Sequence, residues 1–341
     1  MLLPDLEAVH RVLVVRQHDQ LGDMLVAMPL FRALKKRFPG STLTVIARPK
    51  NAEPLMHHPF IDSLLIYDKE RFWSCPKAFF GFLAELRHLQ PDVAVVPSTN
   101  SFSATSALLA FLSGAPIRIG ARRIGEEQNP FAFLFSHPID LDWESEPHRH
   151  QSLRNLDNAR FLDVPMDDLR LEIGFTEEEL RYGQRRASEL RGTCLWLVGF
   201  HIGGKRENRW PPERFAQLAD RLHKELDAAV FLTVGPVDAK PLERFLITAQ
   251  IPHAVLSNLP IRLAASIIRY TNLYVTNDTG MMHLAASTGC RVLSLFGPTD
   301  PLQWAPFGDE HRYIRSESSD MEAIDVETVF AAAKEMLVYK P

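Results

Sequence analysis

Cysteine is scarce in this chain of 341 residues. It holds only Cys75, Cys194 and Cys290, with no Cys-x-x-Cys pair. An odd number of isolated cysteines argues against a disulfide framework and against a structural zinc site. The histidines likewise have no carboxylate or cysteine at convincing metal-ligand spacing. We therefore expect a reducing compartment, by default the cytoplasm, and no metal centre.

The chain also lacks a long apolar run and an excess of charge. No stretch approaches the length of a membrane-spanning helix, and residues 1–7 have no basic start or apolar run typical of a signal peptide. The net charge of -4 gives no general reason to expect nucleic-acid binding. A hydrophobic share of 46% is ordinary for a soluble globular protein. Any contact with a membrane is thus expected to be peripheral.

Two common nucleotide-binding motifs are absent. Neither half of the chain shows G-x-G-x-x-G after its first predicted strand, which weakens a dinucleotide dehydrogenase interpretation. The stretch Gly199 to Lys205 fits G-x-x-x-x-G-K, but Arg206 follows where a P-loop needs Ser or Thr to hold magnesium. We therefore reject a P-loop.

What is present is a repeated alternation of short β-branched runs and helical patterns. It begins with the strand-like run 11–15 and the helical pattern 23–38, and it restarts at 195–200. Between these, residues 121–147 lose the pattern and predict a long irregular connection, followed by a helix over 148–162. Alternation of this kind predicts parallel sheets with helices on both faces.

The length and the restart of the pattern predict an α/β protein of two Rossmann-like lobes, residues 1–170 and 171–341, facing each other across a cleft. Ligands of open parallel sheets bind beyond the carboxyl ends of the strands. The loops after Val15, Phe200, Val234 and Thr276 are therefore the first places to search for a site.

The loop after Val15 carries a carboxylate close to a predicted helix start. Gly22 relaxes the turn and Asp23 falls where exposed amides and the helix dipole favour a negative charge. Asp23 either caps the helix or acts as a general base on a sugar hydroxyl, and the residues alone leave both interpretations open.

The loop after Phe200 combines two glycines with three cations, Lys205, Arg206 and Arg209. Arg and Lys give charge-assisted bonds to phosphate, and glycine removes side-chain obstruction, so the loop suits a diphosphate. The alternative is a solvated basic turn.

Two further loops complete the predicted site of the second lobe. Asp238 follows a predicted strand and either accepts hydrogen bonds from ribose hydroxyls or caps a helix. Asp278, Thr279 and Gly280 follow a strand and open a helix, so free backbone N–H groups there predict an anion site. His283 lies on the same side, where it is either structural or a donor to a phosphate or sugar oxygen.

Together these loops resemble glycosyltransferase family 9, the heptosyltransferases of the lipopolysaccharide inner core. The matching stretches span residues 11 to about 308, and they are the loop 16–23 with its continuation 29–35, Phe38-Pro39, Arg209-Trp210-Pro211 with Phe215, Asp278-Thr279-Gly280 with 283–286, and 296–301.

The resemblance implies a GT-B fold with an acceptor site in the N-terminal lobe and a nucleotide-sugar site in the C-terminal lobe. It implies ADP-heptose as donor, a lipid-linked core oligosaccharide as acceptor, inversion at the anomeric carbon, no metal and no other cofactor. By this similarity Asp23 corresponds to the catalytic base, and Asp278, Thr279, Gly280 and His283 to the donor loop. The family's usual lysine before the tryptophan is Asn208 here.

Other interpretations of the same sequence remain. The fold could use another nucleotide sugar, or transfer to a protein or another glycan; it could epimerise or hydrolyse a nucleotide sugar; or it could bind one without catalysis. The lipid-linked acceptor implies a peripheral visit to the cytoplasmic face of the inner membrane, with Arg118, Arg122 and Arg123 as candidate contacts or as ordinary surface residues.

Overall fold

The structure, a computed structural model, describes residues 6–17 and 20–338. The chain divides into two compact units, Met1–Leu169 and Arg170–Pro341, which are described separately below. No helix in the described ranges is both long and apolar enough to cross a bilayer.

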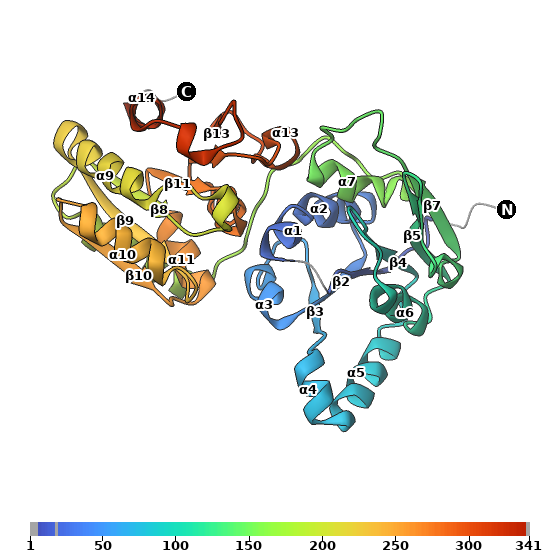
Figure 1. The fold of residues 1–341 in the computed structure, drawn as a ribbon. Helices are drawn as coiled ribbons and strands as arrows, with labels where there is room; N and C mark the ends of the chain where they lie inside the picture. The colour runs from blue at the N-terminus through green and yellow to red at the C-terminus, as the bar shows by residue number, and fades with distance from the viewer. Residues whose placement is uncertain (1–5, 18–19, 339–341) are drawn as a thin grey trace. The chain divides into compact units, whose positions relative to one another are not determined.

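The N-terminal unit is built on one mixed sheet (Figure 1). Within the described residues this sheet has seven strands in the order β3-β2-β1-β4-β5-β6, with β7 paired to β5. All pairs are parallel except the short β5–β6 pair. The strands are β1 (Arg11–Val15), β2 (Thr42–Ala47), β3 (Ser63–Ile66), β4 (Val93–Val96), β5 (Ile117–Ile124), β6 (Glu127–Gln128) and β7 (His137–Leu141).

Helices of this unit connect successive strands. Side chains of α5 and α6 pack with Leu13, Val15 and Ala94 in one buried cluster, so these two helices cover one face of the sheet. The helices are α1 (Leu21–Leu25), α2 (Met28–Arg37), α3 (Pro49–Ala52), α4 (Lys69–Ser74), α5 (Pro76–His88), α6 (Ala104–Leu112) and α7 (Gln151–Asp157), with 3-10 turns η1 (Glu53–Leu55), η2 (Ala132–Leu134) and η3 (Arg160–Leu162).

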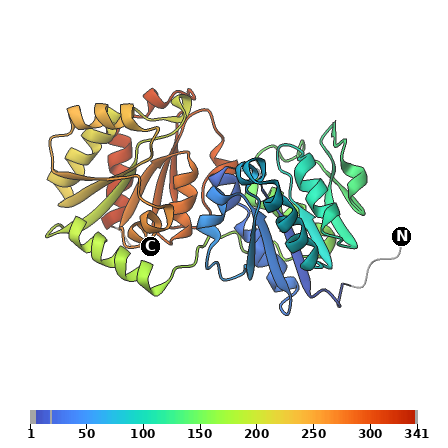
Figure 2. The ribbon, with the colours of Figure 1, turned by 90° about the horizontal axis from the view of Figure 1, so that it is seen from below.

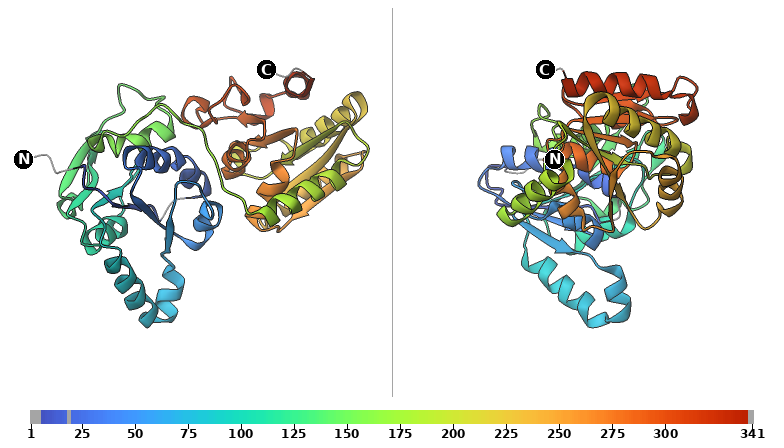
Figure 3. Two further views of the ribbon diagram at one scale, coloured as in Figure 1. Left: turned by 180° about the vertical axis from the view of Figure 1, so that it is seen from behind. Right: turned by 90° about the vertical axis from the view of Figure 1, so that its left-hand side faces the viewer.

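Helices α4 and α5 form a hairpin that projects away from the sheet of this unit (Figures 1 and 3). It begins two residues after the carboxyl end of β3, where Asp68 caps α4 by accepting a hydrogen bond from the Arg71 N–H at 3.0 Å. Pro76 opens α5, a position where its missing N–H costs nothing.

Three sequence predictions for this unit need correction. The single helix over 23–38 is broken between α1 and α2, and Pro29 stands in the first turn of α2, where proline is tolerated. The helix predicted over 148–162 is shorter, because α7 ends at Asp157. The irregular connection 121–147 contains β7, an edge strand.

The C-terminal unit is built on an all-parallel sheet. Within the described residues it has six strands in the order β10-β9-β8-β11-β12-β13. The strands are β8 (Trp196–His201), β9 (Ala228–Val234), β10 (His253–Ser257), β11 (Leu273–Asn277), β12 (Val292–Phe296) and β13 (Arg312–Arg315).

Helices cover both faces of this second sheet (Figure 2). Alternate strand residues divide between two buried clusters: Val198 and Phe200 pack with α9 and α14, whereas Leu197 packs with α8, α11 and α12. Strands buried on both faces are typical of parallel sheets. The helices are α8 (Glu177–Arg191), α9 (Pro212–Leu226), α10 (Ala239–Thr248), α11 (Ile261–Ile268), α12 (Gly280–Ser287), α13 (Pro301–Trp304) and α14 (Val326–Val338), with η4 (Arg206–Asn208) and η5 (Met321–Ala323).

A half-buried ion pair fixes α8 to α11. The Glu179 carboxylate accepts two bonds from the Arg262 guanidinium, both at 2.6 Å, and one from the Thr176 N–H at 2.8 Å. The Arg262 bonds are the main reason that the pKa of Glu179 is lowered to about 2. The ionised form of Glu179 is therefore favoured in the folded state.

We expect Glu179→Gln to lower the free energy of unfolding by about 3 kcal/mol at neutral pH, since it removes the ionised carboxylate that accepts two bonds from Arg262. The stabilisation that ionised Glu179 gives the folded state is complete above the ordinary glutamate pKa of 4.5, and it is lost as the pH falls towards about 2. Urea unfolding of the native protein and the variant at several pH values measures the difference in their unfolding free energies. This difference should become smaller between pH 4.5 and about pH 2. A gap of constant size down to pH 2 would contradict the assignment.

Candidate functional site

The best-formed site of the C-terminal unit lies at the carboxyl ends of its strands. Asp278 and Thr279 directly follow β11, and α12 starts at Gly280. Thr279 is the N-cap, yet its hydroxyl makes no capping bond; the Oγ1 atom is buried and has no hydrogen-bond partner among the residues described. The first-turn amides of a helix have no partner within the helix. This arrangement offers donors to an anion.

The glycine loop after β8 packs against this helix start. Gly204 has a φ of +124°, and a Cβ there would lie 3.0 Å from Thr279 Cγ2. Glycine is thus needed for both the backbone conformation and the close approach. The glycine loop therefore packs directly against Thr279 at the start of α12, and anion binding there stays a prediction.

The Asn277 side chain, at the end of β11, is hydrogen-bonded to two points of the loop after β8. Its Oδ1 accepts from the Trp210 N–H at 2.9 Å, and its Nδ2 donates to the Gly203 carbonyl at 2.8 Å. The Trp210 ring is fully buried, and its Nε1 donates to the Ile324 carbonyl at 2.8 Å. The tryptophan of the Arg-Trp-Pro motif is therefore a structural anchor for the loop.

Asp278 belongs to a small hydrogen-bonded cluster of polar side chains with Asn208 and Thr299. Asn208 Nδ2 donates to Thr299 Oγ1 at 2.9 Å and, more weakly, to Asp278 Oδ2 at 3.4 Å. Burial raises the pKa of the Asp278 carboxyl, while the Thr299 hydroxyl and the Lys205 charge oppose the rise. Asn208 therefore ties Asp278 to the loop after β12, and Lys205 is the cation that acts on Asp278.

The other two predicted cations belong to a different hollow. Arg206 and Arg209 line a cavity of about 540 Å³ together with Arg244, Pro298 and Met321. Arg244 is itself paired with Glu213 in a bidentate ion pair at 2.5 and 2.8 Å. The three cations thus differ in their surroundings: the Lys205 charge acts on the Asp278 carboxyl, whereas the two arginines line this cavity. Their roles stay predictions.

Asp238 is buried beside the glycine loop. Its carboxylate accepts from the Gly235 N–H at 2.8 Å and makes no capping bond to α10, so the helix-capping interpretation does not hold for its side chain. His201, at the end of β8, donates from Nδ1 to the Thr233 carbonyl at 2.9 Å. Burial lowers the pKa of His201, and the Asp238 charge opposes this. Ribose binding by Asp238 stays a prediction.

We expect Gly203→Ala to disturb this carboxylate. A Cβ at Gly203 would lie 2.4 Å from Asp238 Oδ1 and 2.7 Å from its Cγ, so the buried side chain must move. Overpacking of this kind costs about 1–3 kcal/mol of unfolding free energy. Gly235→Ala is the matched control, because its Cβ would lie 3.4 Å from Asp238 Oδ2, an ordinary contact. Equal losses in a urea titration of the two variants would refute the argument.

His283 lies in the first half of α12, one turn beyond Thr279. Its ring is buried, 2% exposed, and its centroid is 6.1 Å from that of Trp304 on α13. These contacts give the histidine a structural role. A contact with donor oxygens stays a prediction.

In the N-terminal unit, Asp23 lies in the first turn of α1 after the carboxyl end of β1. Its Oδ2 accepts from the Gln20 N–H at 3.3 Å in a capping box in which Gln20 is the N-cap and Asp23 the third helical residue, so Asp23 supports the helix start without being the cap residue. The residue is half-buried. Gly22 is the second residue of α1, without a positive φ. His18 and Asp19 of this loop lie outside the described residues. General-base catalysis stays a prediction.

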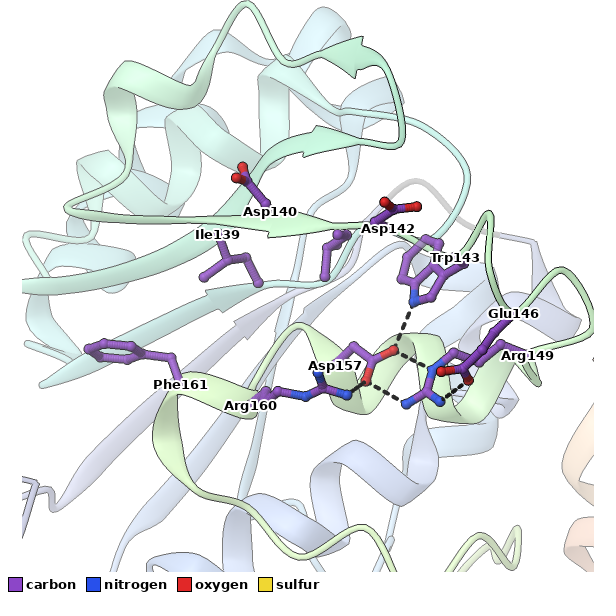
Figure 4. A pocket seen from close by; sticks show the side chains of 10 residues that line it. Ile139, Asp140, Asp142, Trp143, Glu146, Arg149, Asp157, Arg160 and Phe161 are labelled. Atoms are coloured by element: carbon purple, nitrogen blue, oxygen red, sulfur yellow. Dashed lines mark hydrogen bonds and ion pairs between the residues drawn. The ribbon is translucent and has the colours of Figure 1, made fainter.

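A second hollow, of about 540 Å³, lies beside β7 and α7 (Figure 4). At its centre the Asp157 carboxylate accepts from Trp143 Nε1 at 2.8 Å, from Arg149 Nε at 2.6 Å and from Arg160 at 3.0 Å. Asp140 on its rim binds Arg122 at 2.8 Å through Nε. The lining holds four carboxylates, Asp140, Asp142, Glu146 and Asp157, against the two arginines Arg149 and Arg160. Because Arg149 and Arg160 both pair with Asp157, neither guanidinium is left as an unpaired charge for an anionic ligand.

The candidate membrane contacts named from the sequence are also engaged internally. Arg122 and Arg123 pair with Asp140, and Arg118 donates to the carbonyls of Leu134 and Ala115. A contact of these arginines with a membrane stays a prediction.

Sequence reasoning assigned no role to Asn277 or Thr299. Both lie inside stretches that the sequence analysis singled out, so the motif itself was the available signal. Their function in the structure is to join loops that are far apart in sequence, 67 positions for Asn277 to Trp210 and 91 for Thr299 to Asn208. Only tertiary pairing of β8, β11 and β12 reveals this.

Comparison with known proteins fits this architecture. Residues 82–333 match the family described as glycosyltransferase family 9 (heptosyltransferase). Lipopolysaccharide heptosyltransferase 2 of Salmonella typhimurium is 27% identical over 317 residues, covering 86% of this chain and 85% of that protein. Among the described residues, no group of three or more His, Cys, Asp and Glu side chains is arranged to hold a metal ion.

Two solved structures share the fold. The glycosyl transferase family 9 structure from Veillonella parvula superposes with a TM-score of 0.82 at 24% identity, covering 96% of this chain and 97% of that one. The structure titled E. coli ADP-heptose lps heptosyltransferase II gives a TM-score of 0.80 at 23% identity, covering 96% and 98%. Two parallel-sheet α/β units of this kind define a GT-B fold. The chain belongs to glycosyltransferase family 9, the heptosyltransferase family.

Proposed function

We propose that this protein transfers heptose from ADP-heptose to a sugar of a lipid-linked lipopolysaccharide core acceptor, with inversion at the anomeric carbon. The observation that carries the proposal is the start of α12, where the Thr279 hydroxyl is buried without a partner in the described chain and the Gly204 loop lies against it. The names of the similar proteins, a lipopolysaccharide heptosyltransferase and an ADP-heptose heptosyltransferase, supply the substrate class.

In this proposal the diphosphate of the donor binds at the Thr279 and Gly280 amides. A helix N-terminus and oriented amides stabilise negative charge, and a buried hydroxyl adds a donor. Lys205 supplies the positive charge, since it is the cation that acts on the neighbouring Asp278 carboxyl. The departing ADP would gain a full negative charge on its β-phosphate, which these groups offset.

Asp238 is the proposed partner of the ribose hydroxyls. It is buried, and one carboxylate oxygen is held by the Gly235 N–H at 2.8 Å, which fixes its orientation. An ionised carboxylate accepts hydrogen bonds from a diol in the way that acidic residues of other nucleotide-binding folds do.

Asp23 is the proposed general base. The acceptor hydroxyl gives its proton to the carboxylate, its oxygen forms the bond to C1 of the heptose, and the bond from C1 to the diphosphate oxygen breaks. Attack opposite to the leaving group inverts the configuration at C1. The carboxylate lies after the carboxyl end of β1 and is only half-buried, so it keeps part of its surface open to a substrate, as this step requires.

The test is incubation of the purified protein with ADP-heptose and a defined core acceptor, followed by mass spectrometry and linkage analysis of the product. One added heptose with inverted configuration supports the proposal. Transfer only from another nucleotide sugar or only to a protein would replace the substrates and keep the enzyme class. Release of free sugar without acceptor would indicate hydrolysis, and donor binding with no turnover would indicate a binding protein.

A further inference from the structure

The hairpin of α4 and α5 exposes two large aromatic side chains. Trp73 at the end of α4 is 79% exposed and Phe80 on α5 is 68% exposed. No side chain of α4 is buried, and the hairpin stands away from the sheet of its unit (Figure 3). Large aromatic groups held in water are unfavourable unless a partner covers them.

These two side chains are not needed to hold the hairpin together. The packing centres on other rings: Phe72 lies 5.3 Å from both Tyr67 and Phe82 and 5.5 Å from Phe79, between ring centroids. Phe80 adds only an outer edge contact with Phe79, at 6.2 Å. Edge-to-face and tilted pairs at such distances stabilise packing. The hairpin therefore presents Trp73 and Phe80 from a rigid support.

The surface around them is basic. Lys69, Arg71 and Lys77 are exposed, against a single acidic residue, Glu70, in the span from α4 to Phe80. None of these three cations forms an ion pair within the described part of the chain. Aromatic side chains flanked by unpaired Lys and Arg match the interface of an anionic bilayer, where rings lie among headgroups and cations meet lipid phosphates.

We propose that the α4–α5 hairpin docks this protein onto an anionic lipid surface, with Trp73 and Phe80 entering the headgroup region and Lys69, Arg71 and Lys77 contacting lipid phosphates. The site consists of exposed residues only, so no rearrangement of the fold is needed. Docking would be reversible and would weaken at high ionic strength, because exposed charges are screened.

The position of the hairpin in its sheet favours a membrane over another partner. The hairpin follows the carboxyl end of β3, and Asp23 follows the carboxyl end of β1; both strands belong to the same parallel run. Both features therefore lie at one edge of the sheet. This part of the argument rests on the proposed function, in which Asp23 meets a lipid-linked sugar. A bilayer at this edge would bring that sugar to the base.

The experiment is sedimentation of the full-length protein with vesicles of phosphatidylcholine alone or mixed with phosphatidylglycerol. We expect binding to the anionic vesicles only, and its loss at high salt. Replacing all three cations by Gln should lower the partition constant by about a hundredfold, at about fivefold per cation. Trp73→Ser with Phe80→Ser should also abolish sedimentation. Ile247→Ser, at a side chain 79% exposed on α10, is the matched control and should bind normally.

Tryptophan fluorescence gives a second measurement. Trp73 is far more exposed than Trp143 and Trp210, which are buried. Anionic vesicles should shift its emission to shorter wavelength, and Trp73→Phe should remove that shift while vesicle binding persists.

Three outcomes would overturn the proposal: equal binding of the hairpin variants and the native protein, no binding of the native protein to anionic vesicles, or concentration-dependent self-association through the hairpin. Transfer to a soluble, delipidated acceptor is assayed beside it. Hairpin variants should keep that activity. Absent vesicle binding with normal transfer refutes only docking, and absent transfer with normal vesicle binding refutes only the proposed function.

Discussion

Replacing Asp23 by Asn should lower the rate of sugar transfer by about a thousandfold, the middle of the range for loss of a general base. The amide cannot take the proton of the acceptor hydroxyl at neutral pH. Its oxygen can still accept the Gln20 N–H that Asp23 accepts at 3.3 Å, so α1 should keep its cap. The variant should therefore fold as the native protein does.

The measurement is steady-state transfer together with donor affinity by calorimetry. Donor affinity should be unchanged, because the proposed donor groups all belong to the C-terminal unit. Asp92→Asn is the control: Asp92 Oδ2 accepts the N–H groups of His10 and Arg11, both at 2.8 Å, at the amino ends of the strands. Native turnover in the Asp23 variant would exclude it as the base and leave only its capping role.

Replacing Lys205 by Gln should lower kcat/KM by about a hundredfold, since a fixed charge aimed at a developing anion contributes about this much. Lys205 is the cation whose charge acts on the Asp278 carboxyl beside the start of α12. Its removal leaves the helix amides to bind the diphosphate without a counter-charge. Donor affinity should fall together with the rate.

Arg206→Gln and Arg209→Gln are the comparison for this prediction. Both arginines line the cavity with Arg244 and Pro298. Each change should lower kcat/KM by less than about threefold, the effect of an ordinary surface substitution. A larger loss of kcat/KM in either arginine variant than in the lysine variant would indicate that the diphosphate binds in that cavity. It would refute the assignment of Lys205.

The chain alone was sufficient to predict the class of fold. Side chains of a strand alternate between two faces, whereas those of a helix return to one face about every 3.6 residues. The alternation of β-branched runs with helical patterns reflects these two periods, and it correctly predicted parallel sheets. The errors lie where local signals are weak. The strand β7 is only His137–Leu141, contains Pro138 and alternates half-buried and exposed side chains at the sheet edge. An edge strand is defined by its partner, so no local pattern identified it.

The break between α1 and α2 had a signal that the pattern analysis passed over. Apolar residues continue through Val26 and Ala27, so the hydrophobic pattern alone predicts one uninterrupted helix. Pro29, however, can stand only in the first turn of a helix, and α2 begins at Met28. Backbone hydrogen bonding, rather than hydrophobic period, decides that boundary.

Sequence by itself determined that the motifs of the C-terminal unit lie at one edge of its sheet, because short motifs at strand ends mark loops that parallel pairing must bring to a common edge. Tertiary structure decided what each side chain of these loops meets: the Lys205 charge acts on Asp278, Arg206 and Arg209 line another cavity, and Asn208 bonds to Thr299. The physical reason is that spacing along the chain fixes the edge on which a side chain lies. The direction in which that side chain points depends on hydrogen bonds and packing with residues far away in sequence.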